Sequence, residues 1–345
     1  MYGFIDSMMG NIHVGYRYAK LALSFFERFD NREVHCSTIT AFWVLVAPWH
    51  ENSLGDTLEH IRHAFKVGME IGDHENAMFA MMMDCTHSFY SGCPLAILLD
   101  QMNSTVENAA SLGQDMPRYS LIPNQQTVLN LMGRSDDPIV LRGTAMNDDD
   151  FIGRVAPENV EFTLHVMYTA RILLACIFCE YKTAVEIAEK SRKTVAKALP
   201  GSYMMTIHFF YDALATCALL RESGTNSRKH KKVIKATITK MKKWAANSPS
   251  NFKHKLLLLE AEYAVIKRKQ SSACKAYEAA ITAAHKSGMV QDEALSYERA
   301  ALFQLELGDD AKALNYLTTA QQLYLVWGAE AKSSQLQKQL SVMVS

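Results

Sequence analysis

The sequence predicts an all-α protein that is built as a solenoid of stacked helical hairpins. The first observation is an internal repeat, in which three alanines recur 37 residues later. The pairs are Ala264 and Ala301, Ala276 and Ala313, and Ala283 and Ala320. Self-similarity near this period is typical of stacked helix–turn–helix units. In addition, the 345 residues include only 8 prolines, which leaves room for long helices.

The second observation is a spacing of small residues by four and seven positions. It recurs at 15/19/22, 184/188/191, 276/280/283 and 313/317/320, where only Leu317 is large. Residues with this spacing share one face of a helix. Small side chains on that face allow a neighbouring helix to approach closely. We therefore expect Ala276 and Ala313 to lie at tight helix–helix contacts.

Turn residues place the elements in order. The expected turns are Gly10-Asn11, Gly72-Asp73, Gly92, Glu180-Tyr181, Gln270-Ser271, Gly308-Asp309 and Trp327-Gly328. Residues 133–157 hold two prolines, three glycines and an acidic run, so we interpret them as a long loop. The expected organisation is N-terminal hairpins over 1–132, this loop, and C-terminal repeats over 158–345, in one continuous superhelical region.

Composition excludes several classes of protein. The chain has 36 basic and 36 acidic residues, and nucleic-acid binding usually needs a basic excess. Seven cysteines, mostly within apolar helical stretches, favour reduced thiols and a cytoplasmic location over a disulfide framework. No uninterrupted apolar run reaches the roughly 18 residues that a membrane span needs, and the first residues do not form a signal-peptide pattern.

Motifs for catalysis are missing from the sequence. It contains no GxxxxGK[ST] phosphate loop, no set of kinase motifs and no HExxH zinc motif. The acidic run Asp148–Asp150 does not continue into a calcium-binding loop, because Ile152 stands at the fifth position, where an oxygen ligand is needed, and Asn159 at the twelfth, where the closing glutamate is needed. We expect no catalytic, cofactor-binding or metal-binding residues. The residues that we single out form a packing signature, which comprises Ala264, Ala276, Ala283, Ala301, Gly308, Ala313, Ala320, Trp327 and Gly328.

The cysteines leave one catalytic alternative open. Cys85, His87 and Cys93 lie close together in the sequence and could form a cryptic thiol or metal site. Cys176 and Cys179 have CxxC spacing, but they lie among apolar residues, so we expect them to be buried structural cysteines in the middle of a helix. Redox and zinc sites place such pairs at turns or at the start of a helix.

A basic amphipathic helix is expected over residues 228–244. Its apolar stripe includes Ile234, Ile238 and Met241, and lysines cover the rest. Such helices can bind calmodulin-like partners or anionic lipid, but they are more often the solvated face of a repeat helix.

The repeat pattern resembles tetratricopeptide repeats, although the expected C-terminal proline is missing. Residues 207–220, 244–266, 276–303 and 316–336 also resemble one larger family, the last of them with the sequence YLTTAQQLYLVWGAEAKSSQL. That family is the large multidomain signalling ATPases. In these, a serine/threonine kinase-like domain and an AAA-type ATPase domain precede a helical region, which a GAF domain and a histidine kinase or guanylate cyclase often follow. Segments 10–29 and 67–92 fit the same helical region.

The resemblance implies a regulatory helical spacer and not an enzyme, because no position matches the family's catalytic motifs. It also implies a fragment or a paralogue of such a protein. The expected function is therefore a scaffold that binds a protein partner, or adjacent domains of a larger signalling protein, and relays a signal.

Overall fold

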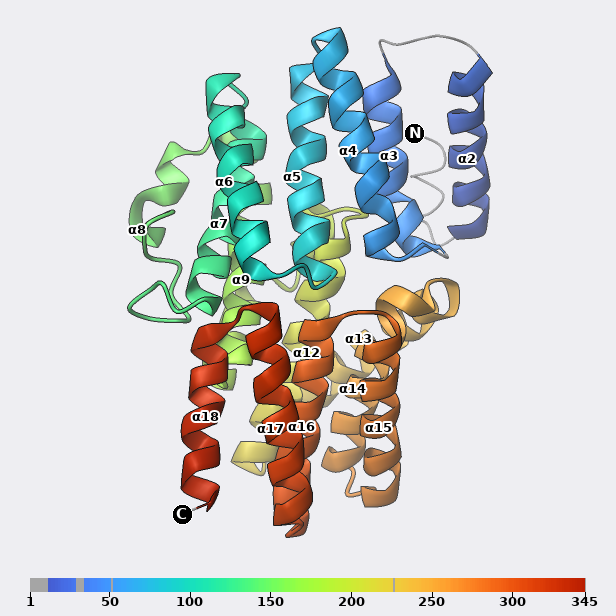
Figure 1. The fold of residues 1–345 in the computed structure, drawn as a ribbon. Coiled ribbons are helices and arrows are strands. Elements are labelled where there is room, and N and C mark those ends of the chain that lie inside the picture. The colour runs from blue at the N-terminus through green and yellow to red at the C-terminus, as the bar shows by residue number, and fades with distance from the viewer. Residues whose placement is uncertain (1–11, 29–33, 51, 226, 345) are drawn as a thin grey trace.

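The computed structural model describes residues 12–28, 34–50, 52–225 and 227–344, so the expected turn at Gly10-Asn11 lies outside the described residues. All regular elements within these ranges are helices, apart from one isolated bridge between Arg142 and Asn147. The prediction of an all-α solenoid is confirmed. Consecutive helices pack side by side and form two rows, which lie one above the other (Figure 1).

The N-terminal row is the upper one in Figure 1. It comprises α2 (Ile12–Arg28), α3 (His35–Leu45), the 3-10 helix η2 (Ala47–Trp49), α4 (Leu54–Ile71), α5 (His74–Tyr90), α6 (Leu95–Ser111) and α7 (Asp115–Leu131). Helix α4 begins with a capping box, in which Ser53 and Asp56 each accept the other's backbone N–H. Such local signals explain why the helices begin where they do.

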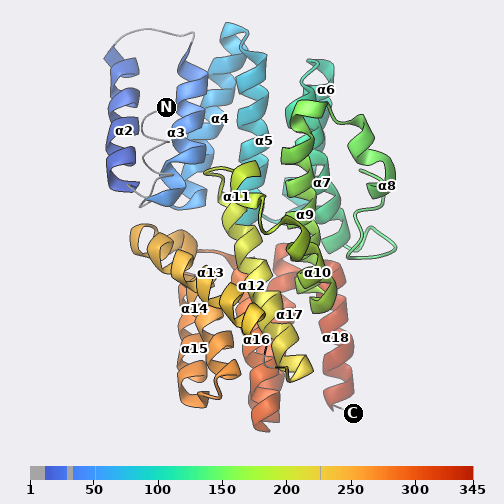
Figure 2. The same cartoon turned by 180° about the vertical axis from the view of Figure 1, so that it is seen from behind.

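A middle segment connects the two rows. It comprises α8 (Asp148–Phe151), η3 (Ile152–Arg154), η4 (Pro157–Asn159), α9 (Val160–Ile177), α10 (Tyr181–Ser191), α11 (Val195–Ala198) and α12 (Tyr203–Ser223). Helix α9 packs on α7, and α12 packs on α9, α13 and α14. Figure 2 shows this segment passing from one row to the other on the back of the molecule. Most residues of α12 are buried, because α9, α10, α13 and α14 pack on it.

The C-terminal row comprises α13 (Arg228–Asn247), α14 (Pro249–Ile266), α15 (Gln270–Lys286), α16 (Val290–Leu307), α17 (Asp310–Trp327) and α18 (Glu330–Val344). The last helix of this row reaches back to the N-terminal row, because α18 contacts α7. The end of the C-terminal row therefore packs on the end of the N-terminal row.

Residues with positive φ mark the corners between helices at a nearly constant interval. The series is Gly72, Gly92, Gly113 and Gly133 in the N-terminal row, and Arg268, Gly288, Gly308 and Gly328 in the C-terminal row. The interval is 20 or 21 residues in the first series and 20 in the second. A two-helix hairpin thus repeats every 40 residues, and the repeat of 37 residues that the alanines suggested is wrong.

The 40-residue repeat changes the register of α15. It aligns Ala313 with Ala273, and both alanines are fully buried. Ala276, which the shorter repeat aligned with Ala313, is only partly buried, as are Ala264 and Ala283. Of the other signature residues, Ala301, Ala320 and Trp327 are buried, and Gly308 and Gly328 cap α16 and α17 in the left-handed conformation.

The segment 133–157 contains more structure than a loop, because α8 and η3 form within it. Two buried amides of α7 hold its first part. The Asn130 amide donates to the carbonyls of Asp137, Pro138 and Val140, and the Gln126 side chain accepts from the backbone N–H groups of Ala145 and Met146. Leu141 and Phe151 are buried, so the segment packs on the core.

Two helices are long and apolar enough to cross a membrane by length and composition, Pro157–Ile177 and Tyr203–Ser223. Polar residues such as His165 and His208 interrupt their apolar runs, which is why no uninterrupted run stands out in the sequence. In this fold, 67% and 89% of their most apolar windows are buried against other helices. Their place in the core accounts for their composition.

The two rows meet along a seam between helix starts and helix corners. The Asn251 amide, in the first turn of α14, donates to the carbonyls of Pro48 and Asn52 and accepts from the Leu54 N–H, at 2.9–3.0 Å. Forty residues later, Gln291 Nε2 donates to the Tyr90 carbonyl at 2.8 Å. Another forty residues later, the next helix start lies against a third corner, where Ala331 faces Gly133. The pitch of one row therefore matches the pitch of the other.

Substitutions at two corner glycines, Gly92 and Gly133, test the seam. Both residues have positive φ, but atoms of the C-terminal row lie closer to Gly92. A Cβ on Gly92 would lie 2.6 Å from Gln291 Oε1 and 3.3 Å from the Val290 nitrogen. A Cβ on Gly133 would have Ala331 Cβ as its nearest neighbour, at 3.7 Å. We expect Gly133→Ala to cost about 1–2 kcal/mol for the left-handed backbone alone. Gly92→Ala should cost about 1–3 kcal/mol more, because it displaces the Gln291 amide. Urea denaturation measures both variants, and equal losses would contradict the contact at Gly92.

A pair of alanine substitutions tests the register of α15. Ala273→Leu overpacks a closed contact and should destabilise the fold by about 1–3 kcal/mol, as should Ala313→Leu at the equivalent position. Ala276→Leu should have a smaller effect, because its side chain is partly exposed. Thermal unfolding compares the three variants. A larger loss for Ala276→Leu than for Ala273→Leu would favour the 37-residue register.

Candidate functional site

A polar cavity of about 450 Å³ lies where the middle segment meets the C-terminal row. It lies between the corner that joins α9 to α10 and the helices α12, α16 and α18. Its polar lining comprises Cys179, Tyr181, Arg221, Glu222, Glu298, Arg299, Glu306, Lys332, Gln335 and Gln339. The residues come from four separate parts of the chain, so the fold and not a local motif brings them together.

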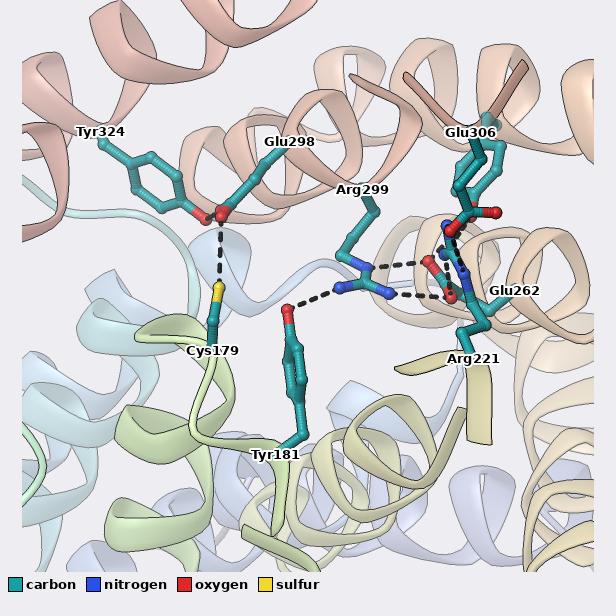
Figure 3. A network of polar contacts seen from close by, with 9 residues as sticks. Cys179, Tyr181, Arg221, Glu262, Glu298, Arg299, Glu306 and Tyr324 are labelled. Atoms are coloured by element: carbon teal, nitrogen blue, oxygen red, sulfur yellow. Dashed lines mark hydrogen bonds and ion pairs between the residues drawn. The ribbon is translucent and has the colours of Figure 1, made fainter. Parts of the chain in front are cut away.

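Glu262 of α14 is the centre of the charged network behind the cavity (Figure 3). Arg299 donates two hydrogen bonds to its carboxylate, from Nε at 2.8 Å and from Nη2 at 3.0 Å. Arg221 Nη1 donates to Glu262 Oε2 at 2.7 Å, and the Tyr277 hydroxyl donates to Oε1 at 2.8 Å. Arg299 Nη1 also donates to the Tyr181 hydroxyl at 2.6 Å. Four hydrogen bonds therefore satisfy a carboxylate that is completely buried.

Glu298 is the centre of a second, smaller cluster. Lys332 Nζ lies 2.6 Å from its Oε1, and the Tyr324 hydroxyl donates to its Oε2 at 3.0 Å. The Cys179 thiol lies 3.8 Å from the same carboxylate (Figure 3). This cluster ties the corner at Cys179 to α16, α17 and α18.

Arg221 joins the buried network to the mouth of the cavity. Its Nη2 donates to Glu306 Oε1 at 2.7 Å and its Nε donates to the same oxygen at 3.2 Å. The Arg221 side chain is 8% exposed, whereas that of Glu306 is 50% exposed. Glu306 and the exposed Glu222 are thus the carboxylates that solvent, or a partner, reaches first.

The network holds its ionisable groups in their charged, paired states. Burial alone would raise the pKa of Glu262, but the guanidiniums of Arg221 and Arg299 lower it to about 2. Burial lowers the pKa of Lys332, yet the Glu298 carboxylate outweighs this effect and raises it. Burial also raises the pKa of the Cys179 thiol, which keeps it protonated. None of these three groups titrates near neutral pH, as a general acid or base would need to do.

A second buried cluster lies nearer the seam. Asp292 Oδ2 is 2.7 Å from Lys255 Nζ and 3.0 Å from His254 Nε2. Burial would raise the pKa of Asp292, but Lys255 and His254 lower it to about 2. Burial lowers the pKa of His254, so the imidazole is neutral. This group resembles a catalytic constellation in composition, but the adjacent cavity is only about 10 Å³, which leaves no room for a substrate.

The alternative of a thiol or metal site at Cys85, His87 and Cys93 is wrong in its geometry. The Cys85 thiol lies 3.5 Å from Thr105 Oγ1 of α6, whereas His87 Nδ1 lies 2.8 Å from Thr57 Oγ1 of α4. The two side chains therefore point to opposite neighbours of α5. Burial raises the pKa of Cys85 to about 12 and lowers that of His87 to about 3. Among the described residues, no three His, Cys, Asp or Glu side chains are grouped to hold a metal ion.

Cys176 and Cys179 differ from the expectation of a mid-helix pair. Cys176 is buried in α9, but that helix ends at Ile177, and Cys179 forms the corner with φ 67°. A nonglycine residue takes this conformation where the surrounding contacts impose it. All seven cysteines are free thiols.

Reasoning from the sequence missed Glu262, Arg299 and Lys332. Two of these residues carried a signal, because Glu262 interrupts the apolar stretch LLLLEAEYAV and Arg299 interrupts ALSYERAALF. A charged residue within an apolar helical stretch indicates a buried ion pair, since an unpaired charge cannot be buried cheaply. The pattern does not reveal which charge pairs with which.

Comparison with known proteins supports the repeat class. The family model for CHK1-like TPR repeats matches residues 146–301, a little under half of the chain. No curated protein matches the sequence. Among solved structures, the crystal structure of yeast Tom70 aligns with 98% of this chain and 80% of that chain, at 12% identity and a TM-score of 0.40. The chain contains a tetratricopeptide-like helical region, and repeats of this kind mediate contacts between proteins.

The buried carboxylate makes stability depend on pH. Glu262 has an ordinary pKa near 4.3 when unfolded and about 2 when folded, so its contribution is present above pH ~4.3 and is lost as the pH falls to about 2. We expect Glu262→Gln to cost roughly 3–5 kcal/mol at pH 7, because it removes the carboxylate that pairs with buried Arg299 and leaves Arg221 with Glu306 as its remaining acidic partner. The difference from wild type should shrink between pH ~4 and ~2.

Guanidinium denaturation over this pH range checks the prediction. Glu186→Gln, at an exposed position of α10, serves as the control and should have little effect at any pH. A Glu262→Gln loss that stays constant down to pH 2 would contradict the charged state of Glu262.

Proposed function

We propose that the chain is a non-catalytic protein-interaction region that receives a segment of a partner protein at the polar cavity. The observation that carries this proposal is the cavity itself. Its charged side chains other than Glu222 are fixed by hydrogen bonds before any partner arrives, and such preorganisation reduces the entropy that binding must overcome. The buried acids and bases titrate far from neutral pH, which favours binding over catalysis.

The charge at the mouth suggests the chemistry of the partner segment. The lining holds three cations, Arg221, Arg299 and Lys332. The lining also holds three carboxylates, Glu222, Glu298 and Glu306, and a fourth, Glu262, lies directly behind it. The surplus is one negative charge, and the two outermost groups are carboxylates. A partner segment with a lysine or arginine side chain fits this arrangement best, because the opposite charge would be attracted to the rim.

The same network offers a route for a signal. Arg221 contacts Glu306, Glu262 and Tyr277. A partner that draws Glu306 away would therefore change the contacts of the Arg221 side chain within the network. The change would then reach α14, α15 and α16 through fixed hydrogen bonds. Coupling of this kind needs two arrangements of the network, and the release of Glu306 supplies the second one.

We further propose that this region works beside the domains of a larger signalling protein in the cytoplasm. The resemblance to the helical region of multidomain signalling ATPases and the match to CHK1-like TPR repeats support this context. The free state of all seven cysteines fits a reducing compartment.

Site-specific photo-crosslinking in cells tests the proposed function. A benzophenone amino acid at Gln339, in the cavity lining, should form a discrete adduct with a partner protein. The same probe at Thr318, an exposed position of α17 outside that lining, is the control and should not form it. Adding Glu306→Lys should abolish the Gln339 adduct. An adduct that survives Glu306→Lys, or that Thr318 also gives, would contradict binding at the cavity mouth.

A further inference from the structure

Helix α13 carries a concentrated positive charge that the proposed cavity does not use. Between residues 228 and 243 it has eight basic side chains and no acidic one, in a chain whose total charge balances. They are Arg228, Lys229, Lys231, Lys232, Lys235, Lys240, Lys242 and Lys243. Figure 2 shows α13 in the C-terminal row. No residue of this helix lines the polar cavity.

The apolar side of α13 is already occupied. Ile234, Ile238 and Met241 are buried, and the helix packs on α12 and α14. A calmodulin-like partner or a membrane would need this apolar face, which the fold does not expose. Those two possibilities for the helix are therefore disfavoured, and only its charged outer side remains for a ligand.

Some of the charges have partners within the chain. Lys229 pairs with Glu189 at 2.6 Å and Lys242 pairs with Glu260 at 3.0 Å. Lys240 lies over the Phe209 ring, 3.5 Å from its centre. In contrast, Arg228, Lys232 and Lys235 form no ion pair with any described residue, and all three are exposed.

Arg228, Lys232 and Lys235 lie around a hollow of about 470 Å³. Arg228, Lys231, Lys232 and Lys235 line it together with the small residues Ala236 and Thr239. Positions 228, 232, 235 and 239 fall on one face of the helix, because their spacing is four, three and four. Short side chains between long basic ones leave room for a backbone to lie along the helix.

We propose that this surface of α13 binds an acidic, extended peptide segment of a partner protein. From residue 228 to residue 239 the helix rises about 16 Å, which matches roughly five residues of extended peptide. The Arg228 guanidinium can donate two parallel hydrogen bonds to a carboxylate, and the lysines provide further positive charge. A bilayer or a nucleic acid would need a wider basic surface, and the balanced charge of the chain argues against one.

The test measures binding of a fluorescein-labelled octaglutamate peptide to the full chain by fluorescence anisotropy at 50 mM salt. Lys232→Glu/Lys235→Glu should weaken binding roughly tenfold or more and flatten its dependence on salt. Lys197→Glu/Lys275→Glu is the matched control, because it changes the net charge equally at two exposed positions outside α13. Its affinity should stay within about twofold of wild type.

Three further probes decide between ligands. An octaglutamine peptide, phosphatidylserine vesicles and a single-stranded oligonucleotide should each bind at least about tenfold more weakly than octaglutamate. Equal losses in the two double variants would show that net charge alone attracts the peptide, and would overturn the proposal. So would tighter binding of the vesicles or the oligonucleotide, or no binding of octaglutamate. Circular dichroism of both variants should match wild type, since all four positions are exposed.

Discussion

The seam between the two rows is the interaction on which the rest of the structure depends. It works because both rows repeat every 40 residues or close to it, so that helix starts at 251, 291 and 331 meet successive corners near 52, 92 and 133. The buried amides of Asn251 and Gln291 satisfy backbone groups that the corners would otherwise leave unpaired. An unpaired buried polar group costs about 1–3 kcal/mol, so a mismatched pitch would lose several such contacts at once.

Packing around α12 explains why so many charged groups lie inside the fold. Helices α9, α10, α13 and α14 pack on α12, and most of its residues are buried. Charges that remain there must be paired, and Glu262, Arg221 and Arg299 do this for one another. Such a network contributes little net stability compared with an apolar core. Its effect is to fix how α12, α14 and α16 lie against each other, and thereby to shape the cavity at their edge.

Much of the fold could be predicted from the sequence, and the errors have physical causes. Small-residue spacing and the turns at Gly308 and Gly328 identified stacked hairpins, because both features are local. The predicted repeat length was wrong because α15 is rich in alanine. Ala276 was therefore paired with Ala313, although the structurally equivalent residue is Ala273. The packing of segment 133–157 on the core could not be predicted, since its anchors, Gln126 and Asn130, are ordinary polar residues of a neighbouring helix.

The candidate site was the least predictable part. Its residues lie as far apart in the sequence as Cys179 and Lys332, and no local pattern connects them. The expectation that Cys176 and Cys179 share a helix failed because a single left-handed residue ends α9 two positions earlier than the apolar stretch suggests. Only the assembled fold brings this corner to α16 and α18.

Hydrogen exchange on an Asn251→Ala variant tests the seam most directly. The Leu54 amide, which donates to Asn251, should lose protection, and so should the amides of α4 and α14 on either side of the seam. Exchange should rise in both rows together, because each row supports the other through this contact. If increased exchange stays confined to α14 while Leu54 and α4 keep their protection, the two rows are stable independently, and the seam does not hold the structure together.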